Sequence, residues 1–439
     1  MMKGAGFIFV ILLLQMGLSS CDTRSNVEDP SLTHFVKFYG GDGDQAGNDL
    51  VALPDGTFIL FGTSKASHPD STSQWYLVKT DVTGNVIWEK KYGVINQNET
   101  ASDIELTPDG RLVAVGNTYK NSSDGDVLIM TFSLDGNKLQ ETIVGLKKPS
   151  TTIDTDEDAV TVTPLTPDGF IVSGSTSSTK VPANPTDIDN RDAMTLRFYN
   201  DLQQFPSVWG QTYGRGTYDA AVKVIQKSDI QFYVFGYSNG TYKGNISSNF
   251  WIYGLGATGT PNTDELLMGT PTAEEKSSSV SVSPFATGYL MGGISYGPAG
   301  TSNIYLSKLR KDLTFEVEDI AGVRPDVQFE KSISINIGSN VPDHTSVIIS
   351  KFEGYYVLAN EKNVIDNQNW LLTKLGNDGL VAWNLPIVFG GEGTDAIGAI
   401  QELPDGRLLL IGTMKTGKPD TGESKMALLK VSKDGKLVD

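Results

Sequence analysis

The sequence of 439 residues contains one cysteine and three histidines. A single cysteine, Cys21, excludes an internal disulfide. Because Cys21 lies outside the repeated part of the chain described below, thiol catalysis in that part is excluded as well. The histidines His34, His68 and His344 lie in unrelated sequence contexts, which argues against a shared metal site or a histidine-dependent triad. We therefore expect no bound metal, no other cofactor and no identifiable catalytic residue.

Positive charge is also scarce. Lysine and arginine number 35 against 52 aspartates and glutamates, which gives a formal net charge of −17. Such a surface repels phosphate backbones, so nucleic acid is excluded as the expected partner. The arginines do not gather at equivalent positions of the repeat, as the carboxylate-binding cluster of a sialidase would require.

The N-terminal apolar run, residues 6–14, is too short to span a bilayer. It follows Lys3 and precedes small residues, a pattern typical of a signal peptide. The segment Leu18-Ser19-Ser20-Cys21 resembles the lipobox of bacterial lipoproteins. The resemblance implies cleavage before Cys21 and acylation of that cysteine, with palmitate as the expected kind of chain. Several acyl chains on one residue suffice for stable membrane attachment.

These observations predict three parts: a signal peptide at 1–20, a lipidated cysteine with a polar tether at 21–31, and a folded domain at 32–439. We expect a protein anchored in the bacterial outer membrane, on its periplasmic or surface side, in preference to the inner membrane. Contact with the membrane is expected through the lipid only.

A repeated pattern fills the rest of the chain. Its clearest copy has the turn Pro54-Asp55-Gly56, two apolar strands, the turn Asp81-Val82-Thr83-Gly84, and a strand from Trp88 to Tyr92-Gly93. Repeats of this length indicate a propeller or an array. The positions equivalent to Asp55 are Asp109, Asp168, Asp229, Thr287, Glu353 and Asp405.

The seven copies supply short β-rich runs bounded by turn residues, four in each copy except the last, and no segment has the pattern of a normal helix. We predict an all-β fold, a seven-bladed β-propeller of four-stranded antiparallel blades. The last copy has no fourth run, whereas residues 32–40 match one, so we expect them to complete the seventh blade. In the fifth copy either 315–320 or 332–337 is the expected outer strand.

The arrangement resembles the bacterial β-propeller repeats of surface lipoproteins, which carry Asp-Gly at one hairpin and Asp-x-x-Gly-x-x-x-Trp near another. Spacing argues against the related boxes of sialidases and quinoproteins. All six tryptophans fall at two repeat positions, which predicts packing between blades. Those residues are Trp75, Trp251, Trp370, Trp88, Trp209 and Trp383.

Five aspartates recur before the first strand of their blades, namely Asp49, Asp103, Asp158, Asp219 and Asp395. Two interpretations stay open. They form a carboxylate ring that attracts a cation at the channel, or each accepts backbone N–H groups of its own loop. The repetition favours the second.

Long loops rich in Ser, Thr, Asn and Gly join the second and third strands, and rigid scaffolds carry functional loops of this kind. Tyr119, Tyr237, Tyr242 and Tyr296 lie in them and are the predicted ligand-binding residues, with loop anchoring as their alternative role. A protein or a glycan of the cell envelope is the expected partner.

The sequence favours a non-enzymatic binding or scaffold protein over an enzyme. The alternative is a glycosidase-like, carbohydrate-active enzyme with a carboxylate pair at the channel mouth. The two differ in one observation: an enzyme needs a concave site where acids converge and at least one pKa is raised.

Overall fold

The computed structural model describes most of the chain from residue 33 onward, and His34–Asp439 is one compact unit. The predicted signal peptide, Cys21 and the 21–31 tether lie outside the described residues. The described ranges are 33–65, 72–93, 96–121, 124–147, 155–177, 190–205, 209, 212–242, 244–270, 272–297, 302–313, 329–333, 344–362, 368–417 and 422–438.

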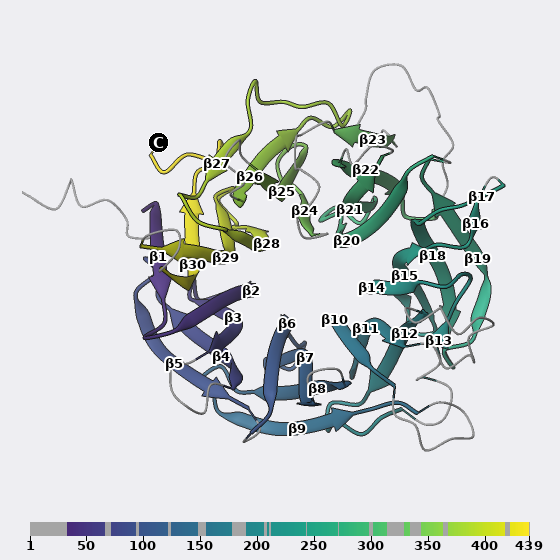
Figure 1. Ribbon diagram of the computed structural model, residues 1–439, viewed down its shortest axis with the longest axis horizontal. Coiled ribbons are helices and arrows are strands. Elements are labelled where there is room, and N and C mark those ends of the chain that lie inside the picture. Colours follow the sequence, from purple (N-terminus) through teal and green to yellow (C-terminus); the bar gives the residue numbers. More distant parts are fainter. Residues whose placement is uncertain are drawn as a thin grey trace, which may run out of the picture. The chain divides into compact units, whose positions relative to one another are not determined.

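Seven four-stranded antiparallel sheets follow one another in a ring, which confirms the predicted seven-bladed propeller (Figure 1). In the first six blades the strands follow chain order from the innermost to the outermost. In the seventh blade the outermost strand comes from the N-terminal end of the chain. The inner strands are β2 (Asp44–Ala52), β6 (Asn98–Leu106), β10 (Glu157–Pro164), β14 (Asp219–Ser228), β20 (Glu274–Val282), β24 (Thr345–Ile349) and β28 (Ala396–Glu402). The second strands are β3 (Phe58–Lys65), β7 (Leu112–Asn121), β11 (Phe170–Ser177), β15 (Gln231–Ser238), β21 (Gly288–Tyr296), β25 (Tyr355–Lys362) and β29 (Leu408–Thr416).

The outer half of each blade is more varied, and blade four carries an extra hairpin, β16 (Thr241–Tyr242) with β17 (Asn245–Ile246). The third strands are β4 (Ser73–Thr80), β8 (Asp124–Phe132), β12 (Arg191–Phe198), β18 (Asn249–Gly256), β22 (Ser302–Arg310), β26 (Gln368–Leu375) and β30 (Glu423–Val431). The outer strands are β5 (Val86–Tyr92), β9 (Lys138–Val144), β13 (Thr212–Tyr213), β19 (Pro261–Met268), β23 (Phe329–Ile333), β27 (Ile387–Phe389) and β1 (Phe35–Tyr39). The described residues include no helix that could cross a bilayer.

Strand direction gives the ring two faces. The first-to-second and third-to-fourth turns lie on one, which we call the hairpin face. The second-to-third loops and the crossings between blades lie on the other, the loop face. The fifth blade's outer strand is β23, which overlaps the expected run 332–337 at its end, while 315–320 lies outside the described residues.

The chain closes its own ring. β1 pairs antiparallel with β30, from Phe35 opposite Lys430 to Tyr39 opposite Met426. The expectation that residues 32–40 complete blade seven is thereby confirmed. Beside this pairing, the Lys425 ammonium donates to the carbonyl oxygens of Gly41 (2.5 Å) and Gly43 (2.8 Å), which fixes the crossing into the first blade.

Neighbouring blades are joined by a contact that we call the clasp. An aromatic side chain and a tyrosine of one outer strand close over the glycine of the next blade's third-to-fourth turn. In the first blade, the Trp88 ring lies against Gly136 and the Tyr92 hydroxyl donates to the Gly136 carbonyl. Equivalent clasps are Phe35 and Tyr39 on Gly84, and Trp209 and Tyr213 on the turn that contains Ala257 and Gly259.

The tryptophans are core residues, as their repeat positions predict. Trp75, Trp209, Trp251 and Trp370 are buried, whereas Trp88 and Trp383 are partly buried and pack against core clusters. Several also bind across the blade boundary. The Trp75 indole N–H donates to Thr100 O of the second blade (2.9 Å), and Trp370 donates to Thr413 O of the seventh (3.3 Å).

Substitution of Gly136 by alanine tests the clasp. Gly136 (φ 71°) and Gly56 (φ 83°) both adopt a left-handed backbone, which costs an alanine about 1–2 kcal/mol. A Cβ at Gly136 would lie 2.6 Å from Trp88 Cη2, whereas a Cβ at Gly56 meets no atom within 4 Å. We expect Gly136→Ala to destabilise the fold by about 1–3 kcal/mol more than Gly56→Ala, measured by denaturant unfolding. Equal losses would contradict the clasp.

Candidate functional site

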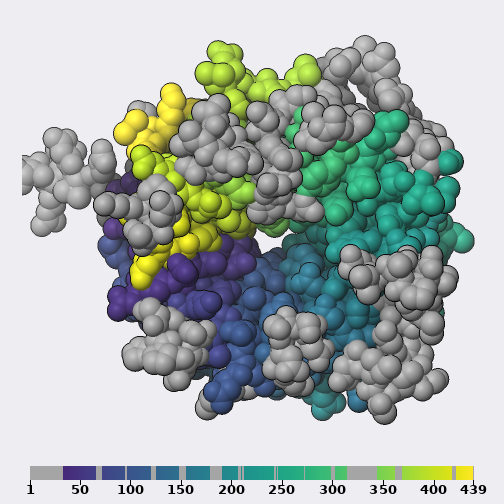
Figure 2. Space-filling view, in the orientation of Figure 1, coloured from purple at the N-terminus to yellow at the C-terminus, as the bar shows by residue number. Residues whose placement is uncertain are grey.

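The inner strands of the blades enclose a central cavity of about 420 Å³. Figure 2 shows this hollow at the centre of the ring. Its described lining mixes polar and charged side chains with leucine, isoleucine and valine, and carries no aromatic side chain besides the imidazole of His344. The cavity therefore suits a small polar ligand better than a flat apolar one.

A repeated irregularity in the inner strands turns side chains into this cavity. Six of the seven inner strands have a register shift near their middle, and such bulges re-aim the residue that follows. In five of the blades the residues directly after the shift are Asp49, Asp103, Thr161, Lys223 and Ser279. Equivalent backbone positions thus carry acidic, basic and hydroxyl side chains in different blades.

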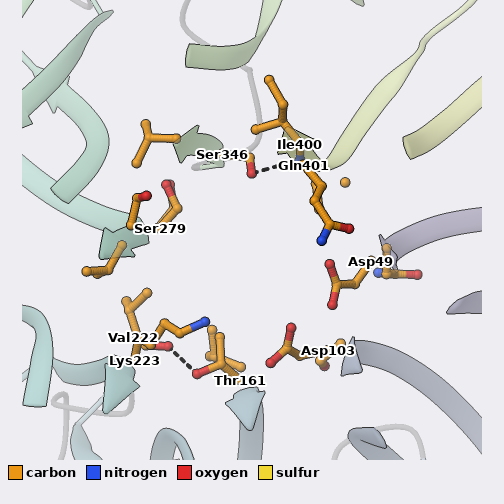
Figure 3. A pocket seen from close by; sticks show the side chains of 18 of the residues that line it. Asp49, Asp103, Thr161, Val222, Lys223, Ser279, Ser346, Ile400 and Gln401 are labelled. Carbon is orange, nitrogen blue, oxygen red and sulfur yellow. Dashed lines mark hydrogen bonds between the residues drawn. The ribbon is translucent and has the colours of Figure 1, made fainter. Parts of the chain in front are cut away.

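Two of these residues form an acid pair. The Asp49 and Asp103 side chains point into the hollow from neighbouring blades (Figure 3). Each carboxylate is held by a backbone N–H of the next blade, Asp49 by Ile104 (3.0 Å) and Asp103 by Val162 (2.8 Å). Burial, the charge of Asp103 and a hydrogen bond between the two carboxyl groups raise the pKa of Asp49 well above its usual range. The Asp49 carboxyl group is therefore protonated more readily than an exposed aspartate.

A lysine and a glutamate complete the charged lining. Lys223 Nζ lies 3.3 Å from Glu105 Oε1. Burial alone would lower the pKa of Lys223, but the carboxylates of Glu105, Asp103 and Asp49 raise it, so the ammonium is retained. Burial raises the pKa of Glu105, and the Lys223 charge opposes that shift.

Polar atoms with spare hydrogen-bonding capacity also face the cavity. Asn48 Oδ1 and Ser279 Oγ are buried and have no hydrogen-bond partner among the described residues. Buried polar atoms are seldom left unpaired, so these two are candidates for contact with a ligand or water. His344 is bound through Nε2 to Gly398 O (3.0 Å), and burial lowers the pKa of its imidazole.

The structure separates the five repeated aspartates. Only Asp49 and Asp103 line the channel. Asp219 and Asp395 accept backbone N–H groups near the loop-face ends of their strands: Asp219 from Arg215 (2.9 Å) and Asp395 from Lys415 (2.8 Å). Asp158 is exposed at the start of β10. A single ring of five carboxylates is therefore wrong, and loop support is confirmed for Asp219 and Asp395. Within the described ranges, no group of three His, Cys, Asp or Glu side chains is placed to hold a metal ion.

A different acidic set repeats around the ring, and the sequence-based prediction includes only two of its members, Asp219 and Asp395. These residues are buried near the loop-face ends of the inner strands, and most lie opposite a serine or threonine of the second strand. The set comprises Glu99, Glu157, Asp219, Glu275 and Asp395. Their signal lies in the spacing: Asp219 and Asp395 precede their turn residues Asp229 and Asp405 by ten positions, whereas Asp49 and Asp103 precede theirs by six.

The buried acids support the crossing between blades. Glu275 accepts the Thr270 N–H (3.2 Å) and the hydroxyls of Thr270 (2.8 Å) and Ser295 (3.0 Å). A Cβ at Gly269 would lie 2.6 Å from Glu275 Oε2, which explains the glycine that follows the outer strand at this crossing. These carboxylates stabilise loops and are not open to a ligand.

The four predicted ligand-binding tyrosines come from three blades. Tyr119 lies near the end of β7 and is partly buried, which raises the pKa of its phenol. Tyr237 stacks on Tyr218 with ring centroids 5.9 Å apart. Tyr296 packs against a core cluster of blades five and six. Tyr242 lies in the β16–β17 hairpin, and its side chain is outside the described part. Their role in binding stays a prediction.

Comparison with known proteins supports the fold of this chain and does not indicate a specific function. No family model and no curated protein matches the sequence. Among solved structures, a hypothetical selenium-binding protein of Sulfolobus tokodaii superposes with a TM-score of 0.50 at 12% identity, covering 93% of this chain and 92% of that one. An α-L-arabinanase of Penicillium chrysogenum complexed with arabinobiose reaches 0.46 at 11% identity over 91% and 98%.

The β-propeller domain of the Trilobed protease from Pyrococcus furiosus, described as having an open velcro topology, gives a TM-score of 0.41 at 11% identity over 93% and 98% of the two chains. Identities this low show the propeller fold alone. The residues of the channel must therefore be interpreted by their own chemistry.

The pH dependence of stability tests the buried acids. Burial raises the pKa of Glu157 to about 7, against hydrogen bonds from Thr155, Thr176 and the Leu146 N–H. An unfolded glutamate titrates near 4.3. The folded state then binds more protons between these values, so this contribution to stability is full below about pH 4 and is lost as the pH rises through 7.

We expect Glu157→Gln to reduce the fall in melting temperature between pH 5 and pH 8, measured by thermal unfolding across that range. The matched control is Glu141→Gln, an exposed glutamate paired with Lys138 (2.5 Å). Parallel pH profiles for wild type and Glu157→Gln would contradict the assignment.

Proposed function

We propose that this protein is a lipid-anchored, ligand-binding propeller of the bacterial envelope that takes a small polyhydroxylated group, such as the end of a glycan, into its central channel. The observation that carries the proposal is the Asp49–Asp103 pair in the central cavity, beside the polar side chains of Thr161, Lys223 and Ser279. Carboxylates accept hydrogen bonds from vicinal hydroxyls, and a retained ammonium donates to them.

The rest of the lining supports binding in preference to catalysis. Lys223 neutralises Glu105, and Asn48 Oδ1 and Ser279 Oγ offer acceptors with no partner among the described residues. The described lining has no arginine and no aromatic platform on which a chain of sugars could be held for cleavage. A site of this kind orients one small polar group.

One observation favours a second candidate function, hydrolysis of a glycosidic bond. A carboxyl group whose pKa is raised can act as a general acid beside a second carboxylate, and Asp49 has that character. In that case Asp49 would protonate the leaving oxygen and Asp103 would act at the sugar carbon or on a water molecule. Release of reducing ends from envelope glycans would favour this candidate over simple binding.

A glycan array with matched variants tests the site. We expect Asp49→Asn and Asp103→Asn each to weaken glycan binding about tenfold or more, because an amide cannot carry the negative charge that the two carboxyl groups share. Asp55→Asn, at an exposed hairpin outside the channel, should bind like wild type. Binding that survives both channel substitutions but is lost in Tyr237→Ala would move the site to the loop face.

Anchoring is tested separately at Cys21. We expect metabolic labelling with a palmitate analogue to mark the wild-type chain, and the Cys21→Ser variant to lose the label and leave the membrane fraction. An unlabelled wild-type chain would contradict the lipid anchor without bearing on the channel.

A further inference from the structure

The hairpin turns of three consecutive blades break the repeat in the same way. Blades one, two, three and seven place Pro-Asp-Gly at the first-to-second turn. Blades four, five and six instead present Ile230, Phe285 and Phe352 there, exposed by 62%, 65% and 62%. Phe285 follows Pro284 at the position where Asp55 follows Pro54. The turns fold with aspartate elsewhere in the ring, so closure of the turn does not require an apolar tip.

More apolar side chains lie on the same sector. The β26–β27 connection of blade six exposes Leu380 and Leu385 on the hairpin face. We call Ile230, Phe285, Phe352, Leu380 and Leu385 together the apolar tips. Large apolar side chains exposed at the same kind of turn on consecutive blades are candidates for contact with a partner or a membrane.

The charge of this sector resembles that of the other blades. The described hairpin-face turns and connections of blades four to six carry two cationic side chains, Lys311 and Lys351, and four acidic ones. The acids are Asp229, Asp312, Glu353 and Asp378. The corresponding turns of the other four blades carry four cations and eight acids. The apolar side chains, and not the charge, therefore set this sector apart.

The chain enters the propeller on this same face. β1 starts at Phe35, opposite Lys430, next to the turn that follows β30 on the hairpin face. The Phe35 ring lies against Gly84, in a third-to-fourth turn. Twelve residues, 22–33, separate Cys21 from His34, and a chain of that length spans at most about 40 Å. A lipid on Cys21 would hold the hairpin face near the bilayer.

We propose that the apolar tips dock the hairpin face on the bilayer surface, as a second membrane contact besides the lipid. The proposal rests on the lipid anchor of the proposed function for its orientation. The contact is hydrophobic, because the side chains that distinguish this sector are apolar. The channel then opens away from the membrane at the loop face.

The test uses a chain that starts at Asp22, which keeps all seven blades and contains no cysteine. We expect it to co-sediment with phosphatidylethanolamine–phosphatidylglycerol vesicles. The triple variant Ile230→Ser, Phe285→Ser, Phe352→Ser should have a vesicle partition coefficient at least about tenfold lower than that of the wild-type chain. Ile246→Ser, equally apolar and 80% exposed but on the loop face, should partition like wild type. Unchanged melting temperatures would show that all variants fold.

Site-specific labelling gives the orientation. An environment-sensitive dye on Phe285→Cys should shift to the blue on vesicles, and the same dye on Ile246→Cys should not. Equal partitioning of the triple variant, or a shift at both sites, would overturn the proposal. So would a concentration-dependent dimer lost in the triple variant, since the tips would then meet a second copy. Failure of Cys21 labelling would contradict the anchor alone, because these vesicle measurements use an unlipidated chain.

Discussion

The clasp between neighbouring blades is the contact on which the rest of the structure depends. An aromatic ring covers a left-handed glycine of the next blade, and a tyrosine hydroxyl binds the carbonyl of the same turn, as with Trp88, Tyr92 and Gly136. The contact ties the outer strand of one blade to a turn of the next. The seventh blade can make this contact only because Phe35 and Tyr39 come from the other end of the chain and reach Gly84.

Closing the ring has a functional consequence at its centre. The inner strands are held at a fixed distance from the axis, so side chains that follow each bulge must share one small cavity. Asp49 and Asp103 come close for this reason, and their proximity raises the pKa of Asp49. The backbone positions after the bulges repeat from blade to blade, but the side chains at these positions differ. One fold can bind different ligands in this way.

The sequence predicts the fold well because the clasp and turn residues recur and interact locally. Residues 32–40 could be assigned to the last blade since Phe35 and Tyr39 keep the spacing of Trp88 and Tyr92. The channel could not be derived in the same way. A bulge changes which side of the strand a residue faces, and Asp49 and Asp219 were therefore grouped together although one lines the channel and the other supports a loop. The Lys223–Glu105 pair joins residues 118 positions apart that share no motif.

Closure of the ring by the N-terminal strand is the central claim, and truncation measures it most directly. A chain that starts at residue 34 should unfold at the same temperature as one that starts at residue 22. A chain that starts at residue 41 should melt at least about 10 °C lower or aggregate, because β30 loses its partner and the clasp on Gly84. Addition of a peptide of residues 32–40 should restore part of the loss. Equal melting temperatures for all three chains would contradict the account.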